Sequence, residues 1–204
     1  MKLLNTASYK NGALLSSGLG IMLIVLSLLG GKIELFLLLN EDLGIAADYF
    51  FHYLTYLGDG IIWVPLAVFI FIYKKQLFPL LLATIIFSTL IVQGSKQFVF
   101  PNEARPAATI TNLTQIHTVE GVELHHSNSF PSGHNTTAFS VYLILCLVLS
   151  ARYFWIIGFF IAALVGYSRV YLAQHFPLDA GAGMLTAVVS VYLSLLIQKR
   201  ISKN

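Results

Sequence analysis

Six long apolar runs, separated by short polar segments, dominate the pattern of this sequence. A helix that crosses a bilayer needs about 20 predominantly apolar residues, and each run approaches that length with its flanking residues. The pattern therefore predicts an all-α membrane protein with six transmembrane helices, forming a single domain over residues 1–204. The predicted spans cover residues 13–29, 60–73, 77–94, 133–149, 153–167 and 180–197.

Composition supports a membrane protein over a soluble one. Apolar residues make up 57% of the chain and charged residues only 10%, whereas about a quarter of the residues in a soluble domain are charged. The net charge of +3 does not indicate nucleic-acid binding, because the basic residues are scattered at segment ends rather than gathered on one stripe. Cys146 is the single cysteine, so an intramolecular disulfide is excluded.

The N-terminal part needs separate treatment. Residues 13–29 follow a basic start, as in a signal peptide, but they end without an Ala-x-Ala-like cleavage site, so we interpret them as an uncleaved first span. Within residues 33–58, the apolar run 33–39 is too short to cross about 30 Å of hydrocarbon, and acidic residues interrupt the part that follows. The segment is also rich in aromatic residues. We expect one or two short interfacial helices there, between spans one and two. An ordinary extramembrane connector is the alternative.

The distribution of basic residues predicts the orientation in the membrane. With six spans and a cytoplasmic N-terminus, eight of the twelve Lys and Arg residues lie inside, as the positive-inside rule expects. All acidic residues and all histidines then lie on the other face. The inner set is Lys2, Lys10, Lys74, Lys75, Arg152, Lys199, Arg200 and Lys203. We expect a multi-pass protein of the inner (plasma) membrane with both termini in the cytoplasm.

Three polar segments interrupt the pattern at the outer ends of the spans. The first comprises Lys96 and Arg105-Pro106, the second is residues 130–134, Phe-Pro-Ser-Gly-His, and the third is residues 168–179. Charge beside or within a membrane span is costly and usually functional. Counting the spans brings all three segments to one membrane face, which is the outer, periplasmic one in the predicted orientation.

The residue types in these segments suit phosphate chemistry. The cations Lys96, Arg105 and Arg169 suit a phosphate dianion. Ser132 and Gly133 would offer backbone N–H groups at the start of a helix, which is a favourable site for an anion. His175 and Asp179 are four residues apart, so the carboxylate could fix the tautomer of a nucleophilic imidazole. His134 could then serve as the general acid and base.

The second and third segments resemble a known family. Pro131-Ser132-Gly133-His134 and Ser168-Arg169-x5-His175-x3-Asp179 are similar to two signatures of the type 2 phosphatidic acid phosphatases, which are integral-membrane lipid phosphate phosphatases. The first signature of that family has six residues between its Lys and Arg-Pro, and here eight residues separate Lys96 from Arg105. The short chain and simple loops favour the bacterial type of this family.

The resemblance implies a role for each of these residues. His175 would be the nucleophile, Asp179 its orienting partner and His134 the general acid. Five further residues would hold the phosphoryl group, and no metal or cofactor would be needed. These five are Lys96, Arg105, Ser132, Gly133 and Arg169. The expected activity is hydrolysis of a lipid phosphomonoester or pyrophosphate through a phosphohistidine, with a lipid phosphate and the bilayer as the partners.

Alternatives remain at three points. A phosphotransferase that uses a lipid alcohol would share the phosphohistidine, and a non-catalytic lipid-phosphate binder or transporter is disfavoured by the complete His/His/Asp set. The substrate is open among phosphatidylglycerol phosphate, phosphatidate, undecaprenyl pyrophosphate and the lipid A phosphates. A zinc site in the loop over residues 97–130 is the third alternative, but its residues lack a recognised metal spacing. Those residues are His117, Glu120, Glu123, His125 and His126. The oligomeric state is not predicted.

Overall fold

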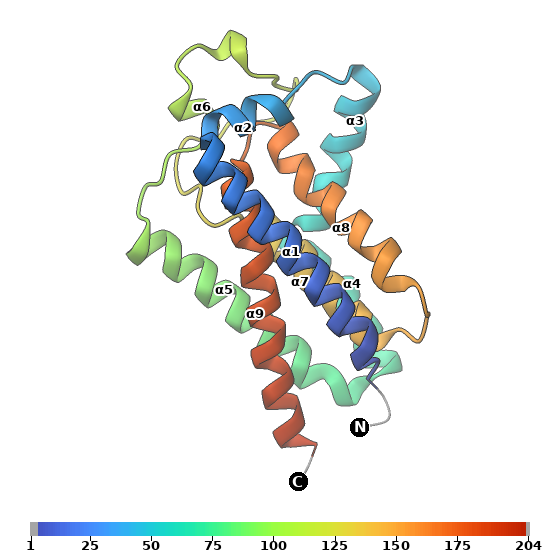
Figure 1. Ribbon diagram of the computed structural model, residues 1–204. Helices are drawn as coiled ribbons and strands as arrows, with labels where there is room; N and C mark the ends of the chain where they lie inside the picture. The colour runs from blue at the N-terminus through green and yellow to red at the C-terminus, as the bar shows by residue number, and fades with distance from the viewer. Residues whose placement is uncertain (1–3, 203–204) are drawn as a thin grey trace.

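The computed structural model describes residues 4–202, and this range is helical without any strand. Lys2 and Lys203, which the orientation argument assigns to the cytoplasm, lie outside the described residues. Figure 1 shows long helices packed along one direction, with the short helices gathered at one end. The α-helices are α1 (Thr6–Gly30), α2 (Lys32–Leu39), α3 (Ile45–Leu54), α4 (Trp63–Tyr73), α5 (Phe78–Gly94), α6 (Pro106–Thr109), α7 (Gly133–Val148), α8 (Phe154–Tyr171) and α9 (Pro177–Ile201).

Helices form at all six predicted spans, but their lengths differ from the prediction. Four are long and apolar enough to cross a membrane: Thr6–Gly30, Lys75–Val99, Phe154–Tyr171 and Pro177–Ile201. A fifth candidate is the bent pair Ile45–Gly58 and Gly60–Tyr73, whose halves meet at 57°. Helix α7 has only 16 residues. The structure is therefore that of an all-helical, multi-pass membrane protein with four to five candidate spans.

The bent pair departs most from the expected plan. We predicted a span over residues 60–73, yet α4 has only 11 residues, and two short 3₁₀ helices precede it. These are η1 (Thr55–Gly58) and η2 (Gly60–Ile62). Asp59 between them is extended, and its Oδ1 accepts a hydrogen bond from the N–H of Gly60. A carboxylate that caps the second segment in this way ends one helix and starts another, which produces the bend.

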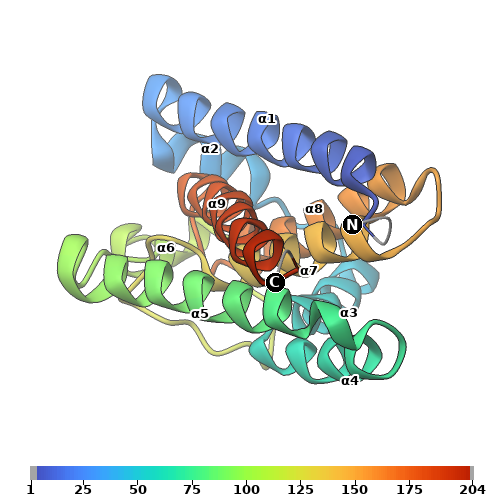
Figure 2. The ribbon, with the colours of Figure 1, turned by 90° about the horizontal axis from the view of Figure 1, so that it is seen from below.

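Helix α9 lies at the centre of the bundle, where it packs against α1, α5 and α7. Figure 2 shows it between α1 and α5. Small residues allow this close packing: a Cβ atom added to Gly181 would lie 2.6 Å from the carbonyl oxygen of Gly20 in α1. A Cβ on Gly183 would likewise meet the Ser132 carbonyl at the start of α7. Glycine contacts of this kind let membrane helices approach backbone to backbone, and this contact fixes the start of α7 beside α9.

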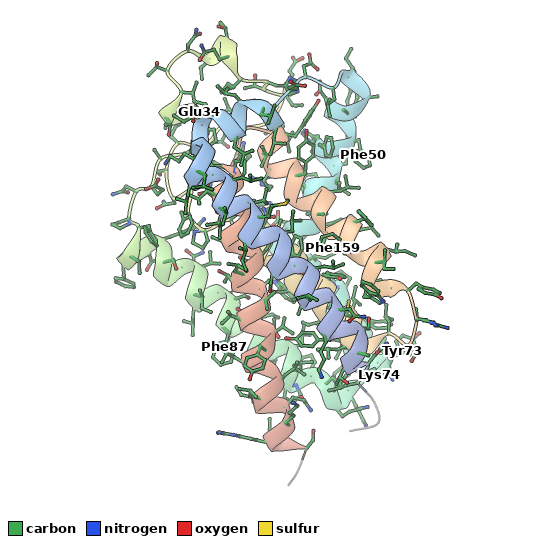
Figure 3. The ribbon with its side chains drawn as sticks, in the orientation of Figure 1. Glu34, Phe50, Tyr73, Lys74, Phe87 and Phe159 are labelled. Atoms are coloured by element: carbon green, nitrogen blue, oxygen red, sulfur yellow. The ribbon has the colours of Figure 1, made fainter. Side chains whose placement is uncertain are left out.

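The two ends of the bundle differ in character. The start of α1 and the end of α9 lie at one end, while α2, α3 and α6 lie at the other (Figure 1). Figure 3 places Tyr73 and Lys74 toward the first end, and Glu34 and Phe50 toward the second. At the second end, a small apolar cluster joins Phe36 of α2, Ile110 and Ile116 of the long loop, and Phe176. This cluster packs the outer segments against the turn between α8 and α9.

Candidate active site

The turn between α8 and α9 presents His175. The carbonyl oxygen of Arg169 accepts hydrogen bonds from the backbone N–H groups of Gln174 (2.9 Å) and His175 (3.0 Å). Ala173 has a positive φ of 54°, so the chain reverses tightly after α8. Pro177 then occupies the first turn of α9, where its missing N–H costs nothing. The turn therefore holds His175 above the end of α8 and just before α9.

Asp179 lies in the first turn of α9 and faces His175. Its Oδ2 atom is 3.4 Å from Nδ1 of His175 and accepts hydrogen bonds from the Ser129 hydroxyl (2.5 Å) and the Phe176 N–H (3.0 Å). His175 and Asp179 are each only 2% exposed. Because Asp179 lies at the Nδ1 side, the Nε2 atom is the one left for another partner. The sequence analysis did not identify Ser129, which reaches Asp179 across fifty positions of the chain.

Ser132 and His134 begin α7 beside this pair. The Ser132 hydroxyl caps the helix, because it accepts from the N–H (3.4 Å) and the Nδ2 (3.1 Å) of Asn135. The Ser132 N–H donates to the carbonyl of Asp179 at 3.0 Å, which ties the starts of α7 and α9 together. A Cβ added to Gly133 would have Val92 as its nearest contact, at 3.9 Å. The backbone at Gly133 therefore has open space beside it.

The two arginines of the site are held differently. Arg169 is buried, and its Nη1 donates to the Thr55 hydroxyl at 2.7 Å, whereas its Nε is buried without a partner among the described residues. Arg105 donates from Nε to the Ser127 carbonyl (2.9 Å) and from Nη1 to the Gln174 carbonyl (3.0 Å). Arg105 thus supports the turn that carries His175, a role that the sequence did not indicate.

Lys96 lies in a π-helical turn, Ser95–Val99, that extends α5. It is half-buried.

The pKa of His175 lies well below its usual range, mainly because the ring is buried and also because Arg105, Arg169 and Lys96 are nearby cations. His175 is therefore a neutral imidazole at neutral pH, as a nucleophile must be. The structure brings together all three cations, both histidines and Asp179.

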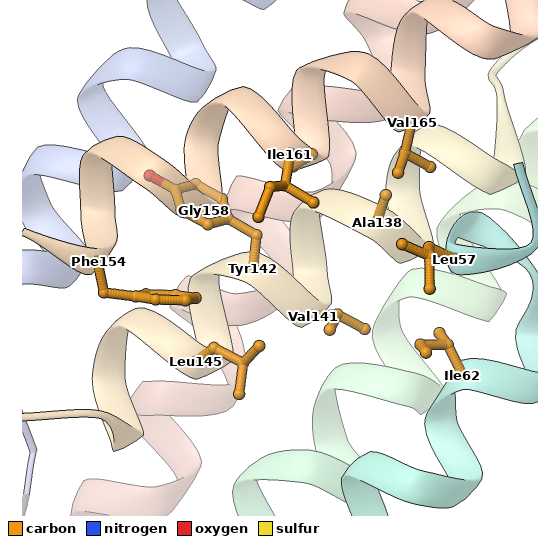
Figure 4. Close-up of a pocket in the computed structure, with 11 residues that line it drawn as sticks. Leu57, Ile62, Ala138, Val141, Tyr142, Leu145, Phe154, Gly158, Ile161 and Val165 are labelled. Carbon is orange, nitrogen blue, oxygen red and sulfur yellow. The ribbon is translucent and has the colours of Figure 1, made fainter. Parts of the chain in front are cut away.

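His134 lines two cavities, and a third lies nearby. One, of about 230 Å³, is lined by His134, Arg169, Thr55 and Asp59 among others. A second, of about 200 Å³, is also lined by His134 and lies against Trp63 of α4 and Gln93 of α5. The third, of about 230 Å³, is apolar and lies between α7 and α8 (Figure 4). It begins one helical turn below His134 and Arg169, at Ala138 and Val165, and Gly158 lies beside the Tyr142 ring.

A separate group of metal-type donors lies in the outer segments. The ligand atoms of Asp42, Asp48 and His117 lie within 4.8 Å of one another, the one such group within residues 4–202. It differs from the loop histidine set considered above. His117 Nε2 is 2.9 Å from Asp48 Oδ1, which also accepts from the Tyr171 hydroxyl at 2.6 Å. These contacts tie α3 and the long loop to the end of α8.

A helical membrane protein with a buried His–Asp pair among cations has the features of a phosphoryl-transfer enzyme. A model of the PAP2 superfamily matches residues 76–203. The chain belongs to the PAP2 superfamily and is a membrane lipid phosphatase.

Two relatives and one solved structure illustrate the similarity. An undecaprenyl-diphosphatase of Sulfolobus acidocaldarius is 29% identical over 184 residues, which cover 87% of this chain and 86% of that protein. The bacitracin transport permease protein BcrC of Bacillus licheniformis is 28% identical over 154 residues, covering 75% and 68% of the two chains. The crystal structure of LpxE from Aquifex aeolicus matches this chain with a TM-score of 0.69 and 32% sequence identity. The match covers 79% of this chain and 93% of the LpxE chain.

Proposed function

We propose that this phosphatase hydrolyses the phosphomonoester or pyrophosphate group of a lipid through a phosphohistidine on His175. The observation that carries the proposal is the buried contact between His175 Nδ1 and Asp179 Oδ2 in a site with three cations. A carboxylate at Nδ1 fixes the tautomer, so that the lone pair lies on Nε2, and it stabilises the charge that develops on the ring.

The reaction takes two steps. In the first, His175 Nε2 attacks phosphorus, and the bond from phosphorus to the leaving oxygen breaks while His134 donates a proton to that oxygen. In the second, His134 accepts a proton from water, the oxygen of this water attacks phosphorus, and the P–N bond breaks to return neutral His175. Five groups hold the phosphoryl oxygens: the side chains of Lys96, Arg105 and Arg169, the Ser132 hydroxyl and the Gly133 N–H at the start of α7.

Trapping the phosphoenzyme tests the roles of the two histidines. His175→Ala should lower kcat on the order of 10⁴-fold or more, as expected for loss of a covalent catalyst. His134→Ala should still form the phosphoenzyme from p-nitrophenyl phosphate, because that leaving group needs no proton. Quenching with denaturant at alkaline pH, which preserves the P–N bond, and mapping of the acid-labile phosphate then identify the residue. Phosphate on His134 in the His175 variant, or elsewhere than His175 in the His134 variant, would contradict the assignment.

The identity of the lipid is tested by a panel. We propose phosphatidylglycerol phosphate, phosphatidate, undecaprenyl pyrophosphate and a lipid A phosphate as candidates, since the relatives include an undecaprenyl-diphosphatase and LpxE. Release of inorganic phosphate from one of these lipids identifies the substrate. Transfer of the phosphoryl group to a lipid alcohol, without free phosphate, would favour the phosphotransferase alternative, which uses the same intermediate.

We also propose six membrane crossings, with both termini in the cytoplasm and the site on the outer face. The positions of Lys74, of the start of α1 and of the end of α9 at one end of the bundle support this orientation. In this arrangement α7 is a short span, and the bent α3–α4 pair crosses the membrane once. A cysteine placed at Thr114 should react with an impermeant thiol reagent in intact cells. Reaction only after the cells are broken would overturn the orientation.

A further inference from the structure

A residue outside the family-matched segment holds one of the cations of the site. Thr55 of η1 precedes residues 76–203, and its hydroxyl oxygen accepts the 2.7 Å hydrogen bond from Nη1 of Arg169. The threonine is 9% exposed and the arginine 7%. We propose that Thr55 is a positioning residue that fixes the guanidinium of Arg169 for phosphate binding, an inference that rests on the function proposed for Arg169.

The geometry of the guanidinium supports this assignment. The group has five N–H donors in a rigid plane, so fixing one nitrogen fixes the direction of the others. The Thr55 contact occupies Nη1, whereas Nε is buried without a partner in the described part of the chain. Arg169 and Thr55 line the same cavity as His134, so the guanidinium that Thr55 fixes borders the space in which a phosphate would bind.

The segment that carries Thr55 is itself fixed against the catalytic helices. A Cβ atom added to Gly58, at the end of η1, would lie 3.0 Å from the carbonyl oxygen of His134 and 3.0 Å from Val165 Cγ1. Thus η1 packs closely on both α7 and α8, and Thr55 is held in register with His134 and Arg169. Asp59 lines the same cavity and its charge acts on Arg169, but within the described residues no hydrogen bond joins the two side chains. The hydroxyl of Thr55 is the side-chain acceptor that Arg169 bonds.

The test compares the binding of orthovanadate, a phosphate analogue, to purified full-length variants. Thr55→Val removes the acceptor with little change of shape, and Thr55→Ser restores it. Arg169→Ala removes the guanidinium, and Thr84→Val is the matched control, because Thr84 is buried and bonds only its own helix, at the Leu80 carbonyl. Affinity is read from the rise of Tm with orthovanadate concentration, and Tm without ligand reports stability separately.

We expect T55V to bind orthovanadate about 10-fold more weakly, the scale for losing a hydrogen bond to a charged group. T55S and T84V should bind like the wild type. R169A should lose about 100-fold or more, and adding T55V to R169A should cause no further loss, because Thr55 acts through Arg169. Should T55V fail to fold, Thr55→Cys, a weak acceptor of similar size, replaces it under the same criteria.

Three results would overturn the inference, and they distinguish its failure from failure of the proposed function. Wild-type affinity in T55V together with weak binding in R169A shows that Arg169 binds phosphate without help from Thr55. A T55V loss that persists in the R169A background shows that Thr55 acts by another route. Wild-type affinity in R169A removes the phosphate-binding role of Arg169 and, with it, the role of Thr55.

Discussion

The turn that carries His175 and the turn that carries Lys96 serve the same site but are built differently. Backbone hydrogen bonds to Arg169, the Asp179 carboxylate and the bulk of α9 fix the first turn, and His175 is almost fully buried. The second is a π-helical turn at the end of α5, where half-buried Lys96 is followed by exposed Gln97 and Phe98. We therefore expect the proposed nucleophile, His175, to be pre-organised and the Lys96 side chain to adjust when a phosphate binds.

This difference predicts that changes in the rigid turn have the largest effects. Asp179→Asn preserves the shape of the side chain but removes the charge that orients His175, so kcat should fall about 10³- to 10⁴-fold. Steady-state kinetics on the lipid identified by the panel measures the effect. Asp42→Asn, at an exposed carboxylate of the outer segments, is the control and should retain activity. A kcat in D179N within about tenfold of the wild-type value would show that the Asp179 charge is not needed to orient His175.

Lys96 should be important but less so. If its ammonium reaches the phosphate, Lys96→Ala should cost about 2–4 kcal/mol of transition-state stabilisation, measured as kcat/KM. Lys96→Arg should restore part of the loss, because a mobile cation tolerates a change of shape better than a fixed one.

Lys32 is the residue to compare with Lys96. It pairs with Glu103 at 2.9 Å and lies 4.9 Å from the centre of the Phe176 ring. Near-normal kcat/KM in Lys96→Ala, together with a loss in Lys32→Ala, would transfer the role to Lys32.

Ser129 tests the rigid turn from the long loop before α7, which contacts Asp179. Besides His175, two donors contact Asp179 Oδ2: the Ser129 hydroxyl and the Phe176 N–H. Ser129→Ala removes the first of these, so we expect kcat to fall about tenfold. Ser140→Ala is the matched control, because the Ser140 hydroxyl is buried without a partner within the described residues. Equal kcat in the two variants would mean that the Phe176 N–H alone is enough to hold the carboxylate.

The smallest expected effect is on stability at low pH. The pKa of His175 is depressed in the folded protein, so below about pH 6.5 the unfolded state binds a proton that the native state does not. The free energy of unfolding therefore decreases as the pH is lowered through this range, and this residue contributes at most about 1.4 kcal/mol per pH unit. His175→Asn should lose less Tm than the wild type between pH 7 and pH 5. Parallel curves would mean that His175 is not buried in its neutral form.

The sequence predicted the helices better than the contacts between them. Apolar runs located every long helix, because hydrophobicity over a span is a local property. The sequence did not predict the bend at Asp59. The bend depends on the Asp59 carboxylate capping the next segment beside two glycines, Gly58 and Gly60, and the apolar pattern does not report such a contact. Ser129 and Thr55 were missed for another reason: each contacts its partner only across the fold, over 50 and 114 positions respectively. Short polar residues with no fixed spacing give no local signal.

The contact between Gly183 and the Ser132 carbonyl limits how this enzyme can move. With no side chain between them, the starts of α7 and α9 have no clearance, and the Ser132 N–H is bonded to the Asp179 carbonyl as well. These two helices must travel as one body. We therefore expect any motion that admits a bulky lipid to occur at the bend near Asp59 and at the π-helical end of α5, where the backbone departs from regular α-helix. The proposed chemistry would then take place in the part of the molecule that stays fixed, and access would depend on the part that bends.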